Sequence, residues 1–471
     1  MEQSFIAFLE DSIKKNWDLD ALTDYKGATL QYKDVARKIE KLHIIFELSG
    51  IKQGDKIAVC GRNSSHWGVT FLAAVTYGAV IVPILHEFKS DNIHNIVNHS
   101  EARLLMVGDM VWENLNENAM PLLEGVILMN DYTLLVSRSS KLDYARDHLN
   151  ELFGKKYPRN FRREHVSYRR DTPEELAVIN YTSGTTGFSK GVMLTGNNLA
   201  GNVMYGIQLG VLYRGEREVC FLPLAHAYSC AFNFLVPMAV GAHVYLLGKV
   251  PSPKILLKAF EEVKPNLILT VPLILEKIYK KMILPQLGKT TMKLALNIPL
   301  LDSRIYAQIR KKLVDAFGGR FREVIVGGAA MNDEVTEFLY KIKFPFTIGY
   351  GMTECGPLIS YDHNDEYVPG SCGQVLKGIM EVRIDSDDPY NKVGEIQVRG
   401  ENVMKGYYKN EEATSQAFTE DGWLHTGDLG TIDHDNRIYI RGRSKTMILG
   451  ASGQNIYPEI IESKLNNLPF V

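Results

Sequence analysis

The sequence carries almost no net charge. Its 53 Lys and Arg residues are balanced by 55 Asp and Glu residues, which gives a formal charge of −2 with 12 His counted as neutral. Without an excess of one sign, no overall field draws the protein to nucleic acid or to an anionic bilayer. We therefore expect no nucleic-acid partner, and recognition of any ligand must depend on local groups.

Paired cysteines are also missing. The five cysteines are scattered, odd in number and contain no Cys-x-x-Cys pair; they are Cys60, Cys220, Cys230, Cys355 and Cys372. This spacing argues against a disulfide framework and against a zinc site. A reducing compartment fits it best.

No hydrophobic run is long enough to suggest a membrane span. The longest uncharged run covers residues 69–85 and is interrupted by Gly78 and Pro83, so it predicts a buried helix leading into a strand. The N-terminal segment carries Glu2 and Glu10 where a signal peptide would carry lysines. We expect a cytoplasmic protein without a transmembrane segment, and we leave peripheral membrane contact and oligomer formation open.

What the sequence does contain is enough apolar material for a large core. Hydrophobic residues make up 45 % and charged residues 23 % of 471 residues, as in globular proteins. This length exceeds one ordinary core, so two or more domains are expected. No short-period repeat or low-complexity tract is present.

The order of apolar patterns predicts an α/β protein. In the first part, strands are expected at 56–60, 80–84 and 103–107 and helices at 33–48 and 67–77, the rhythm of a parallel sheet. Residues 132–170 are basic and polar, and we interpret them as a surface connection.

A second α/β series follows, and the pattern changes again near Cys372. Strands are expected at 219–222, 242–247, 267–271 and 323–326, with helices at 252–263 and 303–317. After Cys372, short alternating runs at 380–384, 394–399 and 435–440 indicate a small β subdomain.

Residues 181–191 carry the strongest local signal. Tyr-Thr-Ser-Gly-Thr-Thr-Gly-Phe-Ser-Lys-Gly lies between two candidate strands, 176–181 and 192–195. Glycines allow close approach of the backbone to a ligand, and the hydroxyls with Lys190 supply donors for phosphate oxygens. The segment is no Walker A loop, since Ser189 stands where that motif needs glycine. A flexible Ser/Thr/Gly hairpin is the alternative.

Four further stretches suit a nucleotide, although each is ambiguous alone. Residues 326–330 end a strand with small residues. They could form a flat wall against which a planar base lies, or they could simply form a tight turn. Residues 348–356 combine Tyr350, Thr353 and Glu354, which suits an adenine beside a hydrated Mg²⁺, while a solvated acid is the plainer interpretation.

The last two stretches lie in the small β region. Residues 421–430 end with Asp428, whose carboxylate can accept hydrogen bonds from both hydroxyls of a ribose. Residues 441–445 add Arg443 and Lys445, useful for phosphate but more often surface charge.

Together, and in this order with Pro-Leu-Ala-His at 223–226, these motifs closely resemble the adenylate-forming superfamily of acyl-CoA synthetases, firefly-type luciferases and peptide-synthetase adenylation domains. The likeness covers nearly the whole chain and is greatest to bacterial-type long-chain fatty acid–CoA ligases. It implies the acyl-CoA synthetase (luciferase-like) fold: two α/β subdomains (1–170 and 171–371, the second with the phosphate loop), a small β subdomain (372–443), and a hinge with the start of a mobile C-terminal α+β domain (444–471).

The resemblance also implies the role of each site residue and the co-substrates ATP, Mg²⁺ and coenzyme A. The ATP phosphates would be held by Thr182, Ser183, Gly184, Thr185, Thr186, Gly187 and Lys190. Mg²⁺ would be held by Thr182 and Glu354. The adenine pocket would be lined by Gly328, Ala329, Tyr350, Gly351 and Met352, with Thr353 at the α-phosphate and Asp428 and Arg443 at the ribose. The catalytic residues would be Lys190, His226, Thr353 and Glu354, and Lys445 would be the hinge.

Three departures from the family pattern stand out. Cys230 replaces the aromatic gate that some long-chain relatives carry four residues after His226, and Ile460 replaces a glutamate. The sequence ends at Val471, whereas the family's C-terminal domain continues for about a hundred more residues and carries the adenylation lysine. We therefore expect a competent nucleotide and acyl cleft with that lysine absent.

The expected activity is an ATP-dependent fatty acid–CoA ligase, an AMP-forming acid–thiol ligase of lipid metabolism acting on small-molecule substrates. Transfer of the acyl group to a carrier protein or an amine is one alternative, and a non-catalytic nucleotide-binding relative is another. His226 is assigned to the acyl site, with a core histidine as its alternative. Five apolar residues after it suit an alkyl tail or ordinary helix packing: Phe232, Phe234, Leu235, Val236 and Met238.

Overall fold

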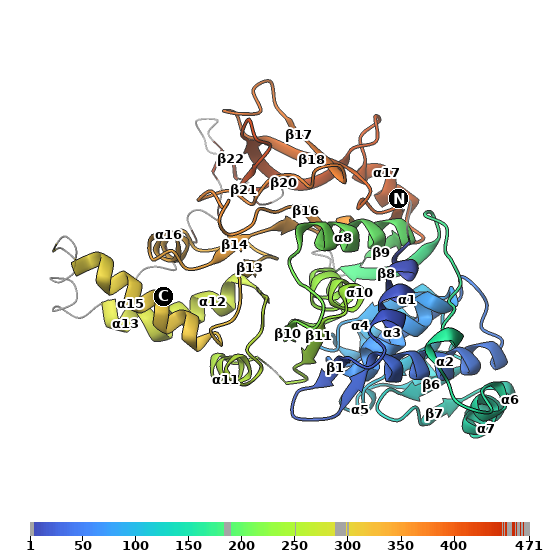
Figure 1. The fold of residues 1–471 in the computed structure, drawn as a ribbon. Coiled ribbons are helices and arrows are strands. Elements are labelled where there is room, and N and C mark those ends of the chain that lie inside the picture. Colours follow the sequence, from blue (N-terminus) through green and yellow to red (C-terminus); the bar gives the residue numbers. More distant parts are fainter. Residues whose placement is uncertain are drawn as a thin grey trace. The chain divides into compact units, whose positions relative to one another are not determined.

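Figure 1 shows the computed structural model as a ribbon. Contacts within the chain divide it into two units, which are described separately. Unit 1 comprises Met1–Pro251, Thr353–Pro357 and Glu401–Thr414, and unit 2 comprises Ser252–Met352, Leu358–Gly400 and Ser415–Val471. The structure describes residues 4–182, 190–249, 251–287, 298, 301–444, 446, 448–449, 455–456, 458, 462 and 465. None of the described helices is both long and apolar enough to cross a membrane.

Unit 1 alternates strands with helices over most of its length. Its strands are β1 (Asp20–Asp24), β2 (Thr29–Gln31), β3 (Lys56–Cys60), β4 (Val80–Ile84), β5 (Ala102–Val107), β6 (Gly125–Leu128), β7 (Leu134–Ser137), β8 (Leu176–Thr182), β9 (Lys190–Thr195), β10 (Arg217–Cys220), β11 (His243–Leu246) and β19 (Gly406–Tyr407). Its helices are α1 (Phe5–Lys15), α2 (Tyr32–Leu48), α3 (Ser65–Tyr77), α4 (Ser90–Ser100), α5 (Asp109–Trp112), α6 (Ser140–Asp147), α7 (Leu149–Lys156), α8 (Gly196–Leu209), α9 (Ala227–Cys230) and α10 (Val236–Val240).

The main sheet of unit 1 has eight strands in the order β19-β9-β8-β4-β3-β5-β6-β7. Strands β8, β4, β3, β5 and β6 run parallel. Strand β9 pairs antiparallel with β8, the edge strand β19 pairs antiparallel with β9, and the edge strand β7 pairs antiparallel with β6. The strands expected at 56–60 and 80–84 are found at those positions, and the α/β fold class is confirmed. The parallel arrangement brings the carboxyl ends of β3, β4, β5, β6 and β8 to one edge of the sheet, where ligands bind in such folds.

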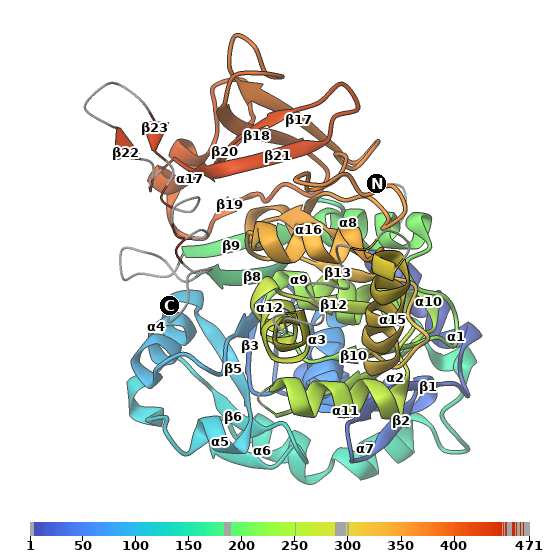
Figure 2. The same ribbon diagram turned by 90° about the vertical axis from the view of Figure 1, so that its left-hand side faces the viewer.

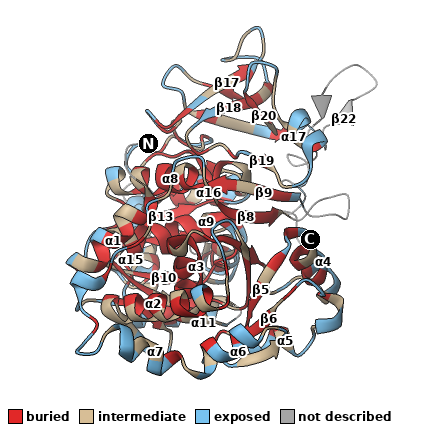
Figure 3. Ribbon diagram, turned by 90° about the vertical axis from the view of Figure 1, so that its right-hand side faces the viewer, coloured by how far each residue is buried: buried red, intermediate tan, exposed pale blue. Residues whose placement is uncertain are grey.

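A second sheet of unit 1, in the order β10-β11-β1-β2, packs with α2, α3 and the helical run from α9 to α10. Aromatic side chains fill the space between them: Phe234 lies edge-on to Trp67 and Phe71, with ring centroids 6.3 and 6.0 Å apart. All three are almost fully buried. Figure 3 shows buried residues in red along α3, β5 and β8.

One segment of unit 1 has more regular structure than expected. Residues 132–170, interpreted as a surface connection, contain β7, α6 and α7. The two helices are short and highly charged, which hid their periodicity, but Leu142, Ala145 and Leu149 are buried. Both helices contact α2, so tertiary packing stabilises segments that would be too short to persist alone.

Unit 2 contains a small parallel sheet and an antiparallel one. Its helices are α11 (Pro253–Val263), α12 (Pro272–Ile278), α13 (Leu284–Leu287), α15 (Leu301–Ala316) and α16 (Asp333–Lys341), and α17 (Glu411–Ala417) runs into it from unit 1. Its strands are β12 (Ile268–Thr270), β13 (Val324–Val326), β14 (Phe346–Ile348), β15 (Tyr350–Gly351), β16 (Leu358–Ser360), β17 (Met380–Asp385), β18 (Gly394–Gly400), β20 (Leu424–Ile432), β21 (Ile438–Arg443), β22 (Ile448–Leu449) and β23 (Asn455–Ile456).

The parallel sheet β12-β13-β14 has α12, α15 and α16 gathered around it (Figure 2). The antiparallel sheet β17-β18-β20-β21 forms the small β structure expected after Cys372, and β15 pairs with β16. The expected strand at 435–440 begins later, at Ile438, because residues 433–437 form the turn that precedes it.

Candidate active site

The ends of the phosphate loop are fixed by the β8–β9 ladder in unit 1. Thr182, the last residue of β8, lies opposite Lys190, the first of β9, and Asn180 lies opposite Val192. Residues two apart in a strand, and residues directly opposite across a ladder, point to the same face of the sheet. Asn180, Thr182 and Lys190 therefore share one face, and Lys190 is exposed there.

The segment that carries His226 is attached to the same face. The side-chain amide of Asn180, which is buried, donates a 3.1 Å hydrogen bond to the carbonyl of Ala225. His226 follows as the residue before α9. The register of β8 thus places the imidazole near the end of the strand that also carries Thr182.

His226 is exposed, so the alternative of a core histidine is wrong. Protein nevertheless surrounds the ring, and this desolvation lowers the pKa of His226, with the Glu87 carboxylate opposing the shift. A lowered pKa favours the neutral imidazole, which can accept or donate a hydrogen bond at neutral pH.

Glu354 joins this face through Tyr407. Strand β19 pairs with β9 so that Tyr407 lies opposite Val192, on the face that Lys190 shares. The phenolic hydroxyl of Tyr407 donates a 2.8 Å hydrogen bond to Oε1 of Glu354, and the Lys190 ammonium lies 4.8 Å from the centre of the Tyr407 ring. Burial, followed by the charge of Glu354, raises the pKa of Tyr407, so the phenol remains a donor.

The backbone reinforces this arrangement. The amide of Met404 donates a 2.7 Å hydrogen bond to the Glu354 carbonyl. Asn198, in α8, donates from its side-chain amide to the carbonyls of Glu401 and Val403 at 2.8 and 2.9 Å. The 401–408 segment is therefore held against both the loop that carries Glu354 and the helix that follows β9.

These residues fit a magnesium ion that is bound largely through phosphate. Tyr407 occupies one carboxylate oxygen of Glu354, and Thr182 adds a hydroxyl from the end of β8. Mg²⁺ commonly takes one or two carboxylates and completes its shell with water and substrate phosphate oxygens. Within the described ranges no group of three or more His, Cys, Asp and Glu could hold a metal ion by itself.

Several expected site residues lie outside the described residues. They are Ser183, Gly184, Thr185, Thr186 and Gly187 of the phosphate loop and Lys445 of the hinge. Their assignments stay predictions.

The expected nucleoside residues of unit 2 come together in a second cluster. The Tyr350 hydroxyl donates a 2.6 Å hydrogen bond to Oδ2 of Asp428, and Nε of Arg443 lies 3.2 Å from Oδ1. Asp428 lies opposite Arg443 in the β20–β21 ladder. Burial raises the pKa of Asp428, although Tyr350 and Arg443 both oppose the shift. Each carboxylate oxygen keeps a further lone pair for a ligand hydroxyl.

The remaining adenine-pocket residues of unit 2 lie where two strands end. Gly328 and Ala329 follow β13 and are exposed, and Gly328 has a φ of +88°, which favours glycine. Gly351 and Met352 follow β14 through the short strand β15 and are partly exposed. Thr353 begins a single 3₁₀ turn, Thr353–Cys355, in unit 1.

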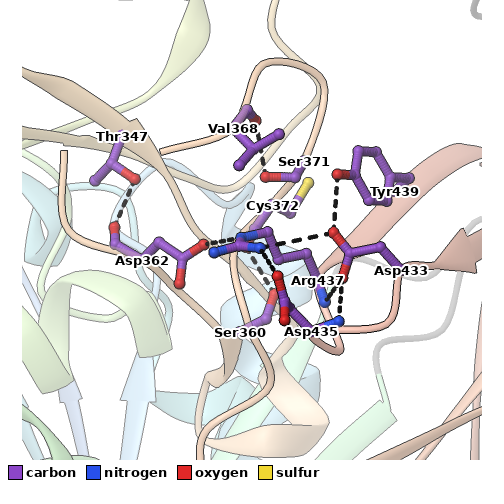
Figure 4. Close-up of polar contacts among 10 residues, drawn as sticks. All are labelled: Thr347, Ser360, Asp362, Val368, Ser371, Cys372, Asp433, Asp435, Arg437 and Tyr439. Carbon is purple, nitrogen blue, oxygen red and sulfur yellow. Dashed lines mark hydrogen bonds and ion pairs between the residues drawn. The ribbon is translucent and has the colours of Figure 1, made fainter. Parts of the chain in front are cut away.

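A polar network in unit 2 ties the strands of the nucleoside cluster together (Figure 4). Nε of Arg437 donates a 3.0 Å hydrogen bond to the buried carboxylate of Asp362, and its Nη1 lies 2.7 Å from Asp435. The carbonyl of Asp362 accepts a 2.7 Å hydrogen bond from Thr347 in β14. The network thus connects β14, which leads into Tyr350, with the turn before β21, which ends at Arg443.

Sequence reasoning missed Tyr407, Asn180 and Arg437. Tyr407 stands in a Gly-Tyr-Tyr-Lys run that signals only a turn, and 53 residues separate it from Glu354. A polar Asn180 within an apolar strand was a visible signal, because a buried amide needs a hydrogen-bond partner.

The apolar residues after His226 are buried as core. Phe234 contacts Trp67 and Phe71, which favours the helix-packing interpretation for this residue over an alkyl-binding wall. Residues Ala231–Leu235 form a single π-helical turn, a feature that occurs often near functional sites.

The fold is that of an α/β protein, and comparisons with known proteins establish its family. The model of the AMP-binding enzyme family matches residues 9–408. The chain belongs to this family of adenylate-forming ligases, which confirms the resemblance noted in the sequence.

Curated relatives are similar along nearly the whole chain. The human long-chain-fatty-acid–CoA ligase ACSBG2 is 27 % identical, with 97 % of this chain and 72 % of the relative covered. The long-chain-fatty-acid–CoA ligase FadD15 of Mycobacterium tuberculosis is 28 % identical, with 90 % and 70 % covered.

Solved structures confirm the fold. ATP-bound MatB from Rhodopseudomonas palustris superposes with a TM-score of 0.78 at 23 % identity, covering 100 % of this chain and 84 % of that one. The anthranilate CoA ligase AuaEII in complex with anthranoyl-AMP gives a TM-score of 0.78 at 20 % identity, with 100 % and 82 % covered. The expected acyl-CoA synthetase-like fold is therefore correct.

Proposed function

We propose that this protein is an ATP-dependent fatty acid–CoA ligase that activates a medium- or long-chain fatty acid through an acyl-AMP intermediate. The observation that carries the proposal is the contact between Tyr407 and Glu354 on the sheet face that holds Thr182 and Lys190. It gathers an oriented carboxylate, a hydroxyl and a cation beside a glycine-rich loop. This set suits a metal-bound triphosphate better than it suits a neutral ligand.

In this proposal, unit 1 acts on the phosphates. Lys190 and the loop donors would stabilise negative charge on the phosphate oxygens, and Thr182 and Glu354 would hold Mg²⁺, which would polarise the phosphoryl oxygens when bound. Thr353 would contact the α-phosphate. Preorganised charges of this kind act mainly in the transition state, so their removal should lower turnover more than it lowers binding.

Unit 2 would recognise the nucleoside. Gly328, Ala329, Gly351 and Met352 would line the adenine, Tyr350 would stack or border it, and Asp428 with Arg443 would bind the ribose. Asp428 is 6 % exposed and is already bonded to Tyr350, so its orientation is fixed before any ligand arrives. Such preorganisation reduces the cost of binding.

The acyl carboxylate would bind beside His226 and attack the α-phosphorus, releasing pyrophosphate. The coenzyme A thiol would then attack the acyl-AMP carbonyl and release AMP. Support for a fatty acid as substrate comes from the relatives at 27–28 % identity, which are named long-chain-fatty-acid–CoA ligases. A cytoplasmic location and Lys445 as the hinge are part of the same proposal.

The test is a panel of carboxylic acids from two to eighteen carbons, with aromatic acids added. AMP release is scored with ATP, Mg²⁺ and coenzyme A, and the thioester is identified by mass. We expect AMP release to require coenzyme A and to be fastest with an unbranched acid of medium or long chain. Acyl-AMP that accumulates until a carrier protein or an amine is supplied would instead favour the alternative acceptor, and ATP binding without acyl-AMP would favour a non-catalytic relative.

A further inference from the structure

A cavity of about 360 Å³ lies in unit 1 among residues that neither cluster uses. It is lined by Leu30, Asp34, Arg37, Lys38, Lys41, Asp131, Tyr132, Arg146, Leu149 and Asn150. Leu30 comes from β2, and the others come from α2, the turn between β6 and β7, and the α6–α7 junction. Helices α2, α6 and α7 lie side by side in Figure 1. The volume falls within the range of small-molecule sites.

The wall formed by α2 is cationic. Asp34, Arg37, Lys38 and Lys41 are spaced by three and four residues, so they project from one face of the helix. Arg146 adds a fourth cation from α6. The four cations are half-buried and face only two carboxylates among the lining residues, Asp34 and Asp131.

Their contacts leave much of this charge uncompensated. Arg37 pairs with Asp34 at 3.1 Å, but Lys38 contacts a histidine ring nitrogen, Nε2 of His66, at 3.3 Å, and Lys41 contacts the amide oxygen of Asn150 at 2.8 Å. Burial, then the charge of Lys41, lowers the pKa of Lys38, although Asp34 and Asp24 oppose the shift. Burial, then the charges of Arg37 and Arg146, lowers the pKa of Lys41. A bound anion would relieve this repulsion.

Tyr132 gives the cavity an aromatic wall. It has a φ of +62°, an uncommon conformation for a bulky residue, and its carbonyl accepts a hydrogen bond from Nε of Arg146. The Lys38 ammonium lies 5.5 Å from the ring centre. The buried hydroxyl of Tyr132 has no hydrogen-bond partner within the described residues and can donate to a ligand oxygen.

We propose that this cavity binds a small phosphomonoester whose dianionic group contacts Lys38, Lys41, Arg37 and Arg146. Four cations favour a phosphomonoester over a lone carboxylate, because its phosphate group carries nearly two negative charges and three strong acceptor oxygens. Leu30, Leu149 and the Tyr132 ring would contact an apolar body next to the phosphate. The cavity is too small for an extended polyanion, and the net charge of −2 also argues against nucleic acid.

The proposed site is separate from the phosphate loop, and it does not rest on the proposed function. The Tyr132 turn follows the carboxyl end of β6, on the edge of the sheet where β8 leads into the loop. β6 is four strand positions from β8, which corresponds to about 19 Å at the usual strand spacing.

The test measures binding of phenyl phosphate by calorimetry to the full chain and to the double variant Lys38→Met/Lys41→Met. Methionine keeps the length of each side chain and the helix propensity of α2. Lys33→Met is the matched control, since Lys33 is on the same helix but pairs with Asp18 at 2.9 Å. We expect the double variant to weaken binding at least tenfold and the control to leave it within twofold.

Equal binding by the three proteins, or binding by none of them, would overturn the proposal. If the double variant unfolds early, the single variants Lys38→Met and Lys41→Met give the same comparison. Cosedimentation with vesicles of phosphatidic acid, against phosphatidylcholine, separates the two sources of a phosphomonoester. If binding of phenyl phosphate requires Lys38 and Lys41 but binding to phosphatidic acid vesicles does not, the ligand is a free metabolite. If binding to both requires the two lysines, the ligand is a lipid headgroup.

Discussion

The Tyr407 hydroxyl lies 2.8 Å from Oε1 of Glu354 and donates to it. The bond joins strand β19, at the edge of the eight-stranded sheet, to the 3₁₀ turn that carries the expected metal ligand. The Lys190 ammonium also lies over the Tyr407 ring. The Tyr407 side chain therefore contacts both of the charged groups in unit 1, Glu354 and Lys190, that we assign to phosphate binding.

Tyr407→Phe should lower the rate of acyl-AMP formation about tenfold while leaving the fold intact. The change removes one hydrogen bond to a charged acceptor, which contributes about 1.5 kcal/mol or more, and retains the ring that contacts Lys190. Pyrophosphate release measures the rate. Tyr408→Phe is the matched control, since the Tyr408 hydroxyl donates at 3.1 Å to the exposed Glu101 instead. Equal losses in both variants would refute the orienting role.

Glu354→Ala should reduce acyl-AMP formation by roughly 10²–10³-fold, as expected for loss of a preorganised electrostatic group. Acyl-AMP is measured by mass spectrometry over a range of Mg²⁺ concentrations. The variant should require more Mg²⁺ than the parent, while its thermal unfolding should change little. A variant that forms acyl-AMP at the parent rate would show that the metal assignment is wrong.

Arg437→Met should destabilise unit 2 by about 3 kcal/mol and weaken ATP binding. The Asp362 carboxylate is 4 % exposed, and removal of its partner would leave a buried charge unpaired. Urea unfolding and calorimetry measure the two effects. Arg441→Met, at an exposed position of the following strand β21, should change neither. In the double variant Asp362→Asn/Arg437→Met the loss should be smaller than the sum of the single losses, and additivity would contradict the coupling.

Glu218→Gln should flatten the dependence of stability on pH. Glu218 is fully buried in β10; burial raises its pKa well above the usual value, and only Oε1 accepts a hydrogen bond, at 2.6 Å from Asn233, within the described residues. Because the folded state holds the proton more tightly, stability is highest below the unfolded pKa and falls as the pH rises toward the folded pKa.

The fall can reach about 1.4 kcal/mol for each pH unit in that window. Glutamine cannot titrate, so the variant should lose less stability than the parent between pH 5 and pH 8. Unfolding free energies at several pH values measure this difference. Glu47→Gln, at an exposed position of α2, should retain the parent profile. An unchanged profile for Glu218→Gln would mean that the carboxyl group is not protonated in the folded state.

Much of the fold was predictable because apolar runs flanked by polar residues mark strand ends. Strands at 56–60 and 80–84 were placed to the residue, and the phosphate loop was correctly expected between two strands. Antiparallel pairing of β9 with β8 was not predictable, because an apolar strand pattern is the same whether the strand pairs parallel or antiparallel with its neighbour. Helices α6 and α7 were missed because contacts with α2, distant in sequence, stabilise them.

The candidate site was predictable to the extent that its residues lie in motifs. The contact of Tyr350 with Asp428 joins two expected residues that are 78 positions apart, and only the tertiary structure brings them together. Tyr407 and Arg437 were not predictable, because their role depends on which distant carboxylate they meet. In the sequence Tyr407 looks like a turn residue and Arg437 like a surface residue, and neither position indicates that its partner is Glu354 or Asp362.

The β8–β9 ladder also sets how this protein tolerates insertions and deletions. Five consecutive pairs, from Val178 with Leu194 to Thr182 with Lys190, determine which side chains share the face with Asn180. Removing one residue from β9 would shift this register and turn the Lys190 side chain to the opposite face, toward Tyr181 and His99, which are hydrogen-bonded at 2.7 Å. Changes in length should therefore be excluded from within the two strands.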